Sequence, residues 1–468
     1  MRPRFVQRHL DPTRTVVLSF AAVIAAGTLL LSLPVSAAPG RAIRVIDALF
    51  MAASATCVTG LAVFDIGTEL SLFGQLVLLG CIQVGGLGLM TFTTVFLVTT
   101  GRRLAIGDRV ALTSSFHHSA TDSLARLIRY IVLGTLAAEA AGAALLSLHW
   151  IREGRFAGVA DTVYHAVFLS ISAFCNAGFG LASDSLTGFR DDPVVVVVIS
   201  LLIVFGGIGF LVSVEVARWL QERVGRVLSR NGVVPRVRLS VHAKLALTTT
   251  AALLILGTPA FFLLEREGAL AGMRAPMAWL NAWFCAVTPR TAGFNTVSYA
   301  QLGGSTILLT MVLMIIGASP GSTGGGIKTT TFGLLVAYAV SRWRGHTRLH
   351  LFNRTVSQES VDKASAVVIS AVGLLVVACM VLVVTETGGP RGENEDQRLV
   401  WLIFEAISAF GTVGLSMGAT SQLTDIGKLI IVGVMFAGRV GPLTLALAIA
   451  RRRRRAQYRY AEENVMIG

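Results

Sequence analysis

The sequence predicts an all-α membrane protein built from internal repeats, and three observations support this fold class. Hydrophobic residues make up 54% of the 468 residues and charged residues only 14%, whereas a soluble domain carries about a quarter charged residues. Apolar stretches long enough to cross a bilayer recur along the whole chain. A short motif ending in glycine and a bulky apolar residue recurs between them. Helices are expected because a helix satisfies its own backbone hydrogen bonds in lipid.

We expect eight transmembrane helices. A hydrocarbon core of ~30 Å takes roughly 20 helical residues, and stretches of about this length or longer lie at 15–35, 71–100, 128–150, 193–217, 245–264, 305–340, 364–385 and 427–450. The first stretch also imitates a secretory signal peptide, because basic residues precede it and PVSAAPG resembles a cleavage site. Cleavage there would remove one element of the repeat, so we interpret it as an uncleaved helix.

The chain has a net charge of +14, and its basic residues are distributed as the expected topology requires. Basic residues precede the first span and occupy every second connection: Arg2, Arg4, Arg8 and Arg14; Arg102, Arg103 and Arg109; Arg218, Arg223, Arg226, Arg230, Arg236, Arg238 and Lys244; Arg342, Arg344, Arg348 and Arg354; and Arg451 to Arg455. The positive-inside rule predicts that both termini and these connections are cytoplasmic. The five consecutive arginines fit anionic membrane lipid, or the end of the last helix, better than nucleic acid, which we exclude as a partner.

No residue pattern in the sequence indicates an enzyme or a resident metal. The five cysteines have neither disulfide nor metal-ligand spacing. His149, His165 and His242 are isolated in the sequence and receive no role. The stretch GSTGGGIKT imitates a phosphate-binding loop, but Ile327 interrupts the motif and no strand precedes it. We therefore expect no catalytic residue and no cofactor in this chain.

The glycine motif occurs as FMAASATCVTGL, FLSISAFCNAGF, WFCAVTPRTAGF and FEAISAFGTVGL. An aromatic residue lies ten positions before each glycine, and three copies carry a serine six positions before it: Phe50, Phe168, Trp283 and Phe404; Ser54, Ser172 and Ser408. Chance similarity between glycine-rich turns is the alternative. The shared offsets favour four parallel repeats of span, pore helix and span, at 1–100, 101–217, 218–340 and 341–468.

The repeated motifs predict an ion filter. We call them the glycine segments: 56–61, 174–179, 289–294 and 411–415. Non-helical backbone at membrane depth must be buried in protein or line a water-filled cavity. We therefore expect eight transmembrane helices and four re-entrant pore helices, with pseudo-fourfold symmetry around one pore.

After each short helix, an extended triplet would turn its carbonyls toward the axis and replace an ion's hydration shell. The predicted filter residues are Val58, Thr59 and Gly60; Asn176, Ala177 and Gly178; Thr291, Ala292 and Gly293; and Thr412, Val413 and Gly414. These triplets contain no carboxylate, which argues against divalent ions. The one charge in the glycine segments, Arg290, is expected to brace the filter from behind.

The sixth span is interrupted by GASPGSTGGGIK. Each glycine costs about 1 kcal/mol of helix stability and proline about 3 kcal/mol, so a continuous helix is not expected. A simple kink is the alternative to an intramembrane loop.

Arg439 lies inside the eighth span, where an arginine is costly and usually faces an interior cavity. We expect it to project below the glycine segments, either as an electrostatic barrier or as a donor to carbonyls of residues 317–326. An ion pair with Glu139 or Glu215 is the structural alternative.

The motifs TCVTGL (56–61), NAGF (176–179), PRTAGF (289–294) and GTVGL (411–415), with GASPGSTGGGIKT (317–329) and GRVGPLT (438–444), resemble the Trk/Ktr/HKT superfamily of potassium transporters. A single span before the first motif makes the bacterial Ktr-type membrane subunit the best match, since Trk members carry additional N-terminal helices. The resemblance implies a multi-pass subunit of the bacterial inner membrane that translocates K⁺ through the filter residues. Na⁺ is a second permeant or activating ion to consider, because each filter motif has a single glycine.

The resemblance also implies a gate and partners. The gate would comprise Gly317, Ser319, Pro320, Gly321, Ser322, Thr323, Gly324, Gly325, Gly326, Lys328 and Arg439. The chain would form a homodimer on a cytosolic ring of nucleotide-binding, RCK-type regulatory subunits, with the basic connections as the docking face.

Two other functions stay open at this point. A secondary transporter coupled to Na⁺ or H⁺ also uses repeats and broken helices. That class usually has inverted repeats and carboxylates at the membrane midplane, whereas these repeats run parallel and acids near span centres are few. A membrane enzyme is a more distant alternative, because no nucleophile–base or metal constellation recurs.

Overall fold

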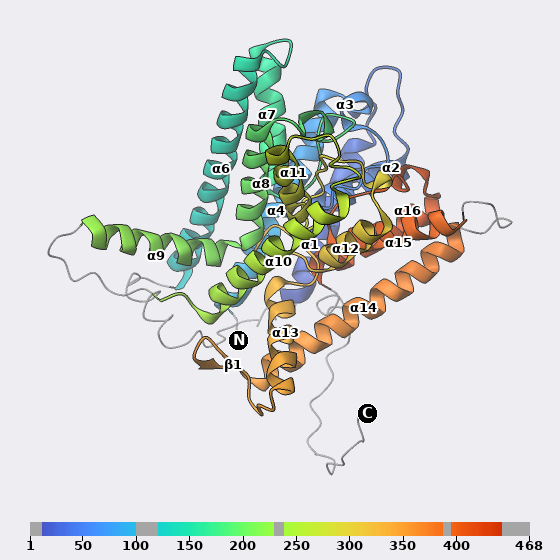
Figure 1. Cartoon of the computed structure of the whole chain (residues 1–468). Helices are drawn as coiled ribbons and strands as arrows, with labels where there is room; N and C mark the ends of the chain where they lie inside the picture. Colours follow the sequence, from blue (N-terminus) through green and yellow to red (C-terminus); the bar gives the residue numbers. More distant parts are fainter. Residues whose placement is uncertain (1–11, 100–119, 229–237, 387–394, 442–468) are drawn as a thin grey trace, which may run out of the picture.

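Helices dominate the structure, a computed structural model that describes residues 12–99, 120–228, 238–386 and 395–441 (Figure 1). Eight helices correspond to the expected spans: α1 (Pro12–Leu31), α4 (Leu72–Thr99), α6 (Ala120–Glu153), α8 (Pro193–Ile208), α10 (Val241–Glu265), α12 (Gly304–Ile315), α14 (Gln358–Glu386) and α16 (Asp425–Val440). A further helix precedes each glycine segment: α2 (Val45–Thr56), α7 (Val159–Phe174), α11 (Ala275–Val287) and α15 (Glu395–Gly411).

The remaining elements are small or lie beside these helices. They are α3 (Ile66–Glu69), α9 (Phe210–Leu228), α13 (Thr329–Trp343) and the 3₁₀ turns Pro34–Ser36, Thr187–Phe189, Tyr299–Gln301 and Thr420–Gln422. Within the described residues one two-stranded antiparallel sheet forms, between β1 (His350–Leu351) and β2 (Arg354–Thr355).

Fewer helices than expected are long enough to cross a membrane. Length and composition support four of the described helices, within Arg14–Leu31, Ile128–Glu153, Val241–Glu265 and Gln358–Glu386, or five if the bent pair α8–α9 is one span. The helices after the glycine segments account for the difference. For example, α12 has 12 residues and α16 has 16, whereas a full span takes roughly 20. The last nine residues of the predicted eighth span, 442–450, lie outside the described residues.

The predicted fourth span, 193–217, is wrong in its second half. α8 ends at Ile208, and α9 turns away from it by 105°, so that α9 projects sideways from the bundle (Figure 1). Gly209 makes this turn with a φ of +93°, a backbone conformation that favours glycine. The next amide, of Phe210, donates to the carbonyl of Gly321 at 3.0 Å. The bend therefore depends on a contact with the loop that interrupts the sixth span.

Paired glycines bring two spans close to the short helices. A Cβ atom at Gly85 would clash with the backbone of Thr56 at the end of α2, and one at Gly206 would clash with the carbonyl of Phe174 at the end of α7. Glycine at these two positions therefore allows the spans to pack closely against the short helices. Gly207 has an additional contact, since a Cβ there would lie 3.4 Å from Asn176 Nδ2 in the second glycine segment.

Ion pairs join the first part of the bundle to the last. Lys428 Nζ of α16 lies 2.7 Å from Asp47 Oδ1 of α2, with 7% and 16% of the two side chains exposed. Arg44 Nη2 lies 2.9 Å from Asp425 Oδ1, in a more exposed position. α2 and α16 are thus tied together at the ends where both helices begin.

Candidate functional site

The four short helices end in the same unusual backbone conformation. Left-handed residues follow their ends: Val58 (φ 55°), Asn176 (φ 59°), Thr291 (φ 73°) and Thr412 (φ 50°). All four are completely buried. A positive φ is rare outside glycine, and for β-branched residues it is strained, so the surrounding structure must impose it. Strain of this kind is concentrated at functional sites.

Two residues further on, each glycine also has a positive φ: Gly60 (96°), Gly178 (71°), Gly293 (80°) and Gly414 (91°). Any side chain here would be strained and would also collide with the neighbouring segment. A Cβ at Gly60 would meet the carbonyl of Ala177, one at Gly178 that of Ala292, one at Gly293 that of Val413, and one at Gly414 that of Thr59. The first segment thus contacts the second, the second contacts the third, the third contacts the fourth, and the fourth contacts the first. The four glycine segments therefore form a closed ring, which we call the glycine ring.

Backbone amides in the ring donate hydrogen bonds to serines of the short helices that precede them. Thr59 N donates to Ser54 O at 2.8 Å, Ala177 N to Ser172 O at 2.7 Å, and Val413 N to Ser408 O at 2.8 Å. The glycine amides of two segments are bonded as well, Gly60 N to Ser54 Oγ at 3.2 Å and Gly414 N to Ser408 Oγ at 3.1 Å. The recurring serine was visible in the sequence, but its role was not.

In the third segment, Thr288 takes the place of the serine. Ala292 N donates to Thr288 O at 3.0 Å. Thr288 Oγ1 donates to the carbonyl of Phe294 at 2.5 Å.

Carbonyl oxygens of the ring have no such partners. Among the described residues, none of the carbonyls of the twelve predicted filter residues accepts a hydrogen bond from the protein. Buried carbonyls are ordinarily paired, and a cluster without partners needs another explanation, such as water or an ion. The ring therefore has uncharged oxygens that remain free to act as ligands.

Side chains of the second and third segments pack behind the ring. Asn176 and Thr291 Oγ1 lie 3.2 Å apart. With the Asn176 amide nitrogen oriented toward Ile203 O (3.2 Å) and Ala173 O (3.0 Å), the amide oxygen accepts from Thr291 Oγ1 and every partner is satisfied. Arg290 Nη2 donates to Thr250 Oγ1 of α10 at 3.2 Å, so this cation points away from the ring.

Residues 317–328, the 317–328 loop, connect α12 to α13 and form a closed hairpin. Gly317 N donates to Ile327 O at 2.9 Å, and Ser319 Oγ lies 2.8 Å from Thr329 Oγ1. Most of the loop is buried, with Ser319, Ser322 and Thr323 at most 1% exposed. The interruption of the sixth span is therefore an ordered loop and not a simple kink.

This loop contacts three of the glycine segments and the end of α8. Gly325 N donates to Thr412 Oγ1 at 3.0 Å, and Thr323 Oγ1 donates to Phe174 O at 3.3 Å. A Cβ at Gly324 would clash with Thr291 Oγ1. On the other side, Ser319 N donates to Gly207 O at 3.0 Å. The loop thus touches residues adjoining three of the four segments.

Arg439 is completely enclosed and holds the loop in place. Its guanidinium donates to the carbonyl of Thr323 in the loop and to that of Gly85 in α4, the latter at 2.6 Å. The expected hydrogen bonding to the loop is confirmed for one carbonyl, that of Thr323. Glu139 instead accepts from Gln83 at 3.2 Å and Glu215 from Ser240 at 3.0 Å, so the ion-pair alternative is wrong. Lys328 Nζ adds a bond to Gly324 O at 2.6 Å.

The spans, the glycine ring and the buried loop define a class, a polytopic membrane transport protein. Comparison with known proteins gives the family. A family model of TrkH cation transport proteins matches residues 6–458. The chain belongs to this family.

Several characterised relatives are similar along their whole length. The potassium/sodium uptake protein NtpJ of Enterococcus hirae is 36% identical over 99% of this chain and 98% of its own. The Ktr system potassium uptake protein B of Vibrio alginolyticus is 38% identical over 97% and 94%, and that of Bacillus subtilis 35% identical over 98% and 97%. Among solved structures, the potassium transporter TrkH of Vibrio parahaemolyticus superposes with a TM-score of 0.72 at 19% identity, covering 96% of this chain and 87% of that one. This last likeness supports the fold.

Proposed function

We propose that this chain is the potassium-translocating membrane subunit of a bacterial K⁺ uptake system, with the glycine ring as its ion filter. The observation that carries the proposal is the set of ring carbonyls without protein partners, in residues that are buried or partly buried. Carbonyl oxygens replace the water that an alkali cation loses on entering a filter. The names of the full-length relatives, which refer to potassium or potassium and sodium uptake, supply the ion.

The same ring explains why a monovalent ion fits better than a divalent one. Its predicted filter residues carry no carboxylate, and the one cation in the glycine segments, Arg290, donates to Thr250 of α10. Uncharged oxygens can offset the free-energy cost of removing water from K⁺ more readily than from a divalent ion, which binds its water more strongly. Because each segment has one glycine, we expect discrimination against Na⁺ to be incomplete, so that Na⁺ is a competing ion.

The 317–328 loop and Arg439 form the proposed gate. Support comes from the loop's position against three glycine segments and from the two carbonyls that Arg439 holds together. A loop that is held in place by a few hydrogen bonds can change conformation without unwinding a span, whereas a continuous helix cannot. Release of the Thr323 carbonyl by Arg439 would free the loop to move.

The proposed assembly follows the four-repeat organisation at 1–100, 101–217, 218–340 and 341–468, with both termini cytoplasmic in the inner membrane. Two copies would sit on a cytosolic, nucleotide-binding ring that docks on the basic connections. The Ktr system names of the relatives support a partner subunit. Full nucleotide-regulated flux through a purified monomer would contradict this part of the proposal.

Reconstitution tests the function itself. Purified chain in liposomes should carry K⁺ down an imposed K⁺ gradient, in the absence of Na⁺ and proton gradients, and its gene should rescue a bacterium that lacks K⁺ uptake. A flux that requires a Na⁺ or proton gradient would assign the chain to the coupled transporters instead. No K⁺ flux from well-folded protein, together with failure to rescue, would overturn the proposal.

A further inference from the structure

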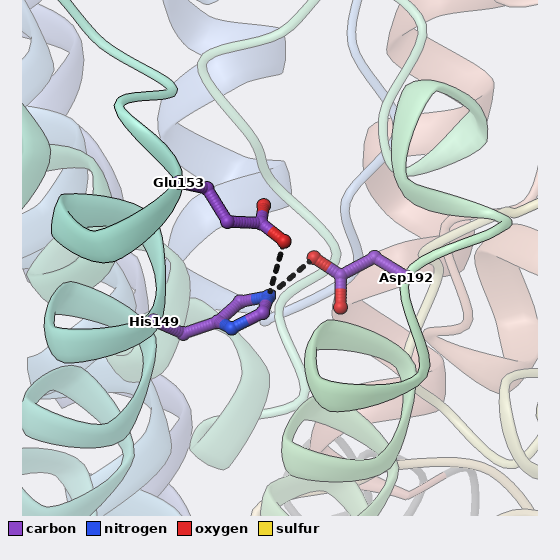
Figure 2. Close-up of side chains that lie close together, drawn as sticks. All are labelled: His149, Glu153 and Asp192. Carbon is purple, nitrogen blue, oxygen red and sulfur yellow. Dashed lines mark hydrogen bonds and ion pairs between the residues drawn. The ribbon is translucent and has the colours of Figure 1, made fainter.

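Three side chains with metal-binding atoms converge where α6 ends and α8 begins (Figure 2). His149 Nε2 lies 2.8 Å from Asp192 Oδ2 and 3.5 Å from Glu153 Oε1. The three ligand atoms all lie within 4.8 Å of one another. His149 received no role from its sequence context, because Asp192 is 43 residues away and only folding brings the two together.

Two of the three side chains are already held in position. Asp192 is the N-cap of α8, and its Oδ1 accepts from Val194 N at 2.9 Å and Val195 N at 3.2 Å. Its Oδ2 is therefore left for His149. His149 and Asp192 are 21% and 14% exposed in their side chains, whereas Glu153 is 48% exposed. The cluster thus has an ordered inner part and one ligand on the side open to solvent.

Equivalent junctions elsewhere in the bundle are simpler. Glu265 at the end of α10 accepts from Gly303 N, just before α12, at 3.0 Å. Glu386 at the end of α14 accepts from Thr424 N, just before α16, at 3.2 Å. One carboxylate is enough to connect the helices at those two junctions. The α6–α8 junction therefore has more ligand groups than a structural connection requires.

The geometry of the cluster also calls for a cation. A single imidazole N–H can be donated well to one acceptor only, yet two carboxylates approach Nε2. Two carboxylates facing each other repel unless a positive charge lies between them, and a metal ion on Nε2 can bond both, whereas the single Nε2–H of a protonated imidazole serves one of them well. Within the described part of the chain, Glu153 and Asp192 form ion pairs with His149 and not with a lysine or arginine.

We propose that His149, Glu153 and Asp192 bind Zn²⁺ at this junction, on the outer face of the membrane in the proposed orientation. An imidazole combined with carboxylates suits Zn²⁺ and related transition metals, whereas Mg²⁺ and Ca²⁺ prefer all-oxygen sites. Three protein ligands leave the fourth tetrahedral position of Zn²⁺ for water. The ion would fasten the end of α6 to the start of α8, which flank the helix α7 leading into the second glycine segment.

Calorimetric titration of Zn²⁺ into the full chain tests this site. The protein should be purified without a histidine tag and treated with a chelator. We expect saturable binding of about one Zn²⁺ per chain and a higher unfolding temperature with Zn²⁺, neither of which Mg²⁺ reproduces. His149→Ala should abolish both effects. Glu153→Gln, which leaves the His149–Asp192 contact intact, should weaken binding by about tenfold or more.

Two variants serve as matched controls. His165→Ala removes another partly exposed histidine, which lies within α7 and pairs with the carboxylate of Asp161, and Glu267→Gln removes an exposed carboxylate, 84% exposed, in the connection after α10. Both should bind Zn²⁺ like the unaltered protein. Absence of saturable binding by the unaltered chain, or equal affinity in the Glu153→Gln variant and the unaltered chain, would overturn the proposal even if His149→Ala fails to fold.

Discussion

Ser54 and Ser408 determine how the glycine amides of two segments are held. Each hydroxyl accepts from the amide of the glycine six residues later, at 3.2 Å for Gly60 and 3.1 Å for Gly414. Replacement by alanine leaves a buried amide without a partner, which costs roughly 1–3 kcal/mol. We therefore expect Ser54→Ala and Ser408→Ala to lower the free energy of unfolding and to reduce K⁺ over Na⁺ preference in uptake competition.

Ser172 offers the matched control. It occupies the same position in the second segment, but its Oγ has no hydrogen-bond partner within the described residues. Ser172→Ala should therefore change neither stability nor selectivity appreciably. An effect of Ser172→Ala as large as that of Ser54→Ala would contradict the role assigned to the serine hydroxyls.

Among single residues, the sequence predicted those whose residue type is unusual at their position. Glycines at a fixed offset and one arginine inside a span are visible because composition alone makes them costly. The meeting of His149 with Asp192 is invisible, since it depends on how two helix ends are placed in space. The glycine ring lies between these cases: the four motifs were evident, whereas their closed order of contacts comes from the fold.

The 317–328 loop behaves as one element, and its removal tests the proposed gate. Deleting residues 320–324 would remove the Thr323 carbonyl that Arg439 binds and keep the bond between Gly317 and Ile327 at the base of the hairpin. We expect K⁺ flux through liposomes to rise severalfold and to depend less on the regulatory partner. Arg439→Ala should act in the same direction.

Arg439→Lys separates charge from geometry in this element. A lysine keeps the positive charge but lacks the planar fork that reaches the carbonyls of Thr323 and Gly85 together. If the loop is held by those two bonds, Arg439→Lys should resemble Arg439→Ala. Normal flux in both, or loss of flux in a well-folded deletion protein, would count against a gate in this loop.

Hydropathy predicted the positions of the helices along the sequence better than their directions in space. The interruption of the sixth span was evident because five glycines and a proline are clustered there. The 105° turn after α8 was missed, since residues 210–217 are apolar enough to continue a span. The turn depends on Phe210 N bonding the Gly321 carbonyl, a contact between distant parts of the chain that local composition does not encode.

For the whole molecule, the ion pair between Asp47 and Lys428 connects the first short helix to the last span. Because both side chains are largely buried, Lys428→Met should destabilise the protein by roughly 1–3 kcal/mol. Arg44→Met, which removes the exposed pair to Asp425, should cost less than about 1 kcal/mol. Denaturant unfolding of the two purified variants measures both values. Equal and small effects would mean that this contact does not stabilise closure of the bundle.

If the glycine ring selects the ion, glycine-to-serine variants should differ from the unaltered protein in the competition between K⁺ and Na⁺ for uptake. Gly178→Ser places a side chain against the Ala292 carbonyl, whereas Gly433→Ser in α16 places it in open space. We expect Gly178→Ser to fold and insert but to lower the K⁺/Na⁺ ratio by about tenfold, equivalent to ~1.4 kcal/mol. Serine at Gly60, Gly293 or Gly414 should act in the same direction, and Gly433→Ser should leave the ratio unchanged. An unchanged ratio in all four ring variants, with uptake retained, would contradict the claim.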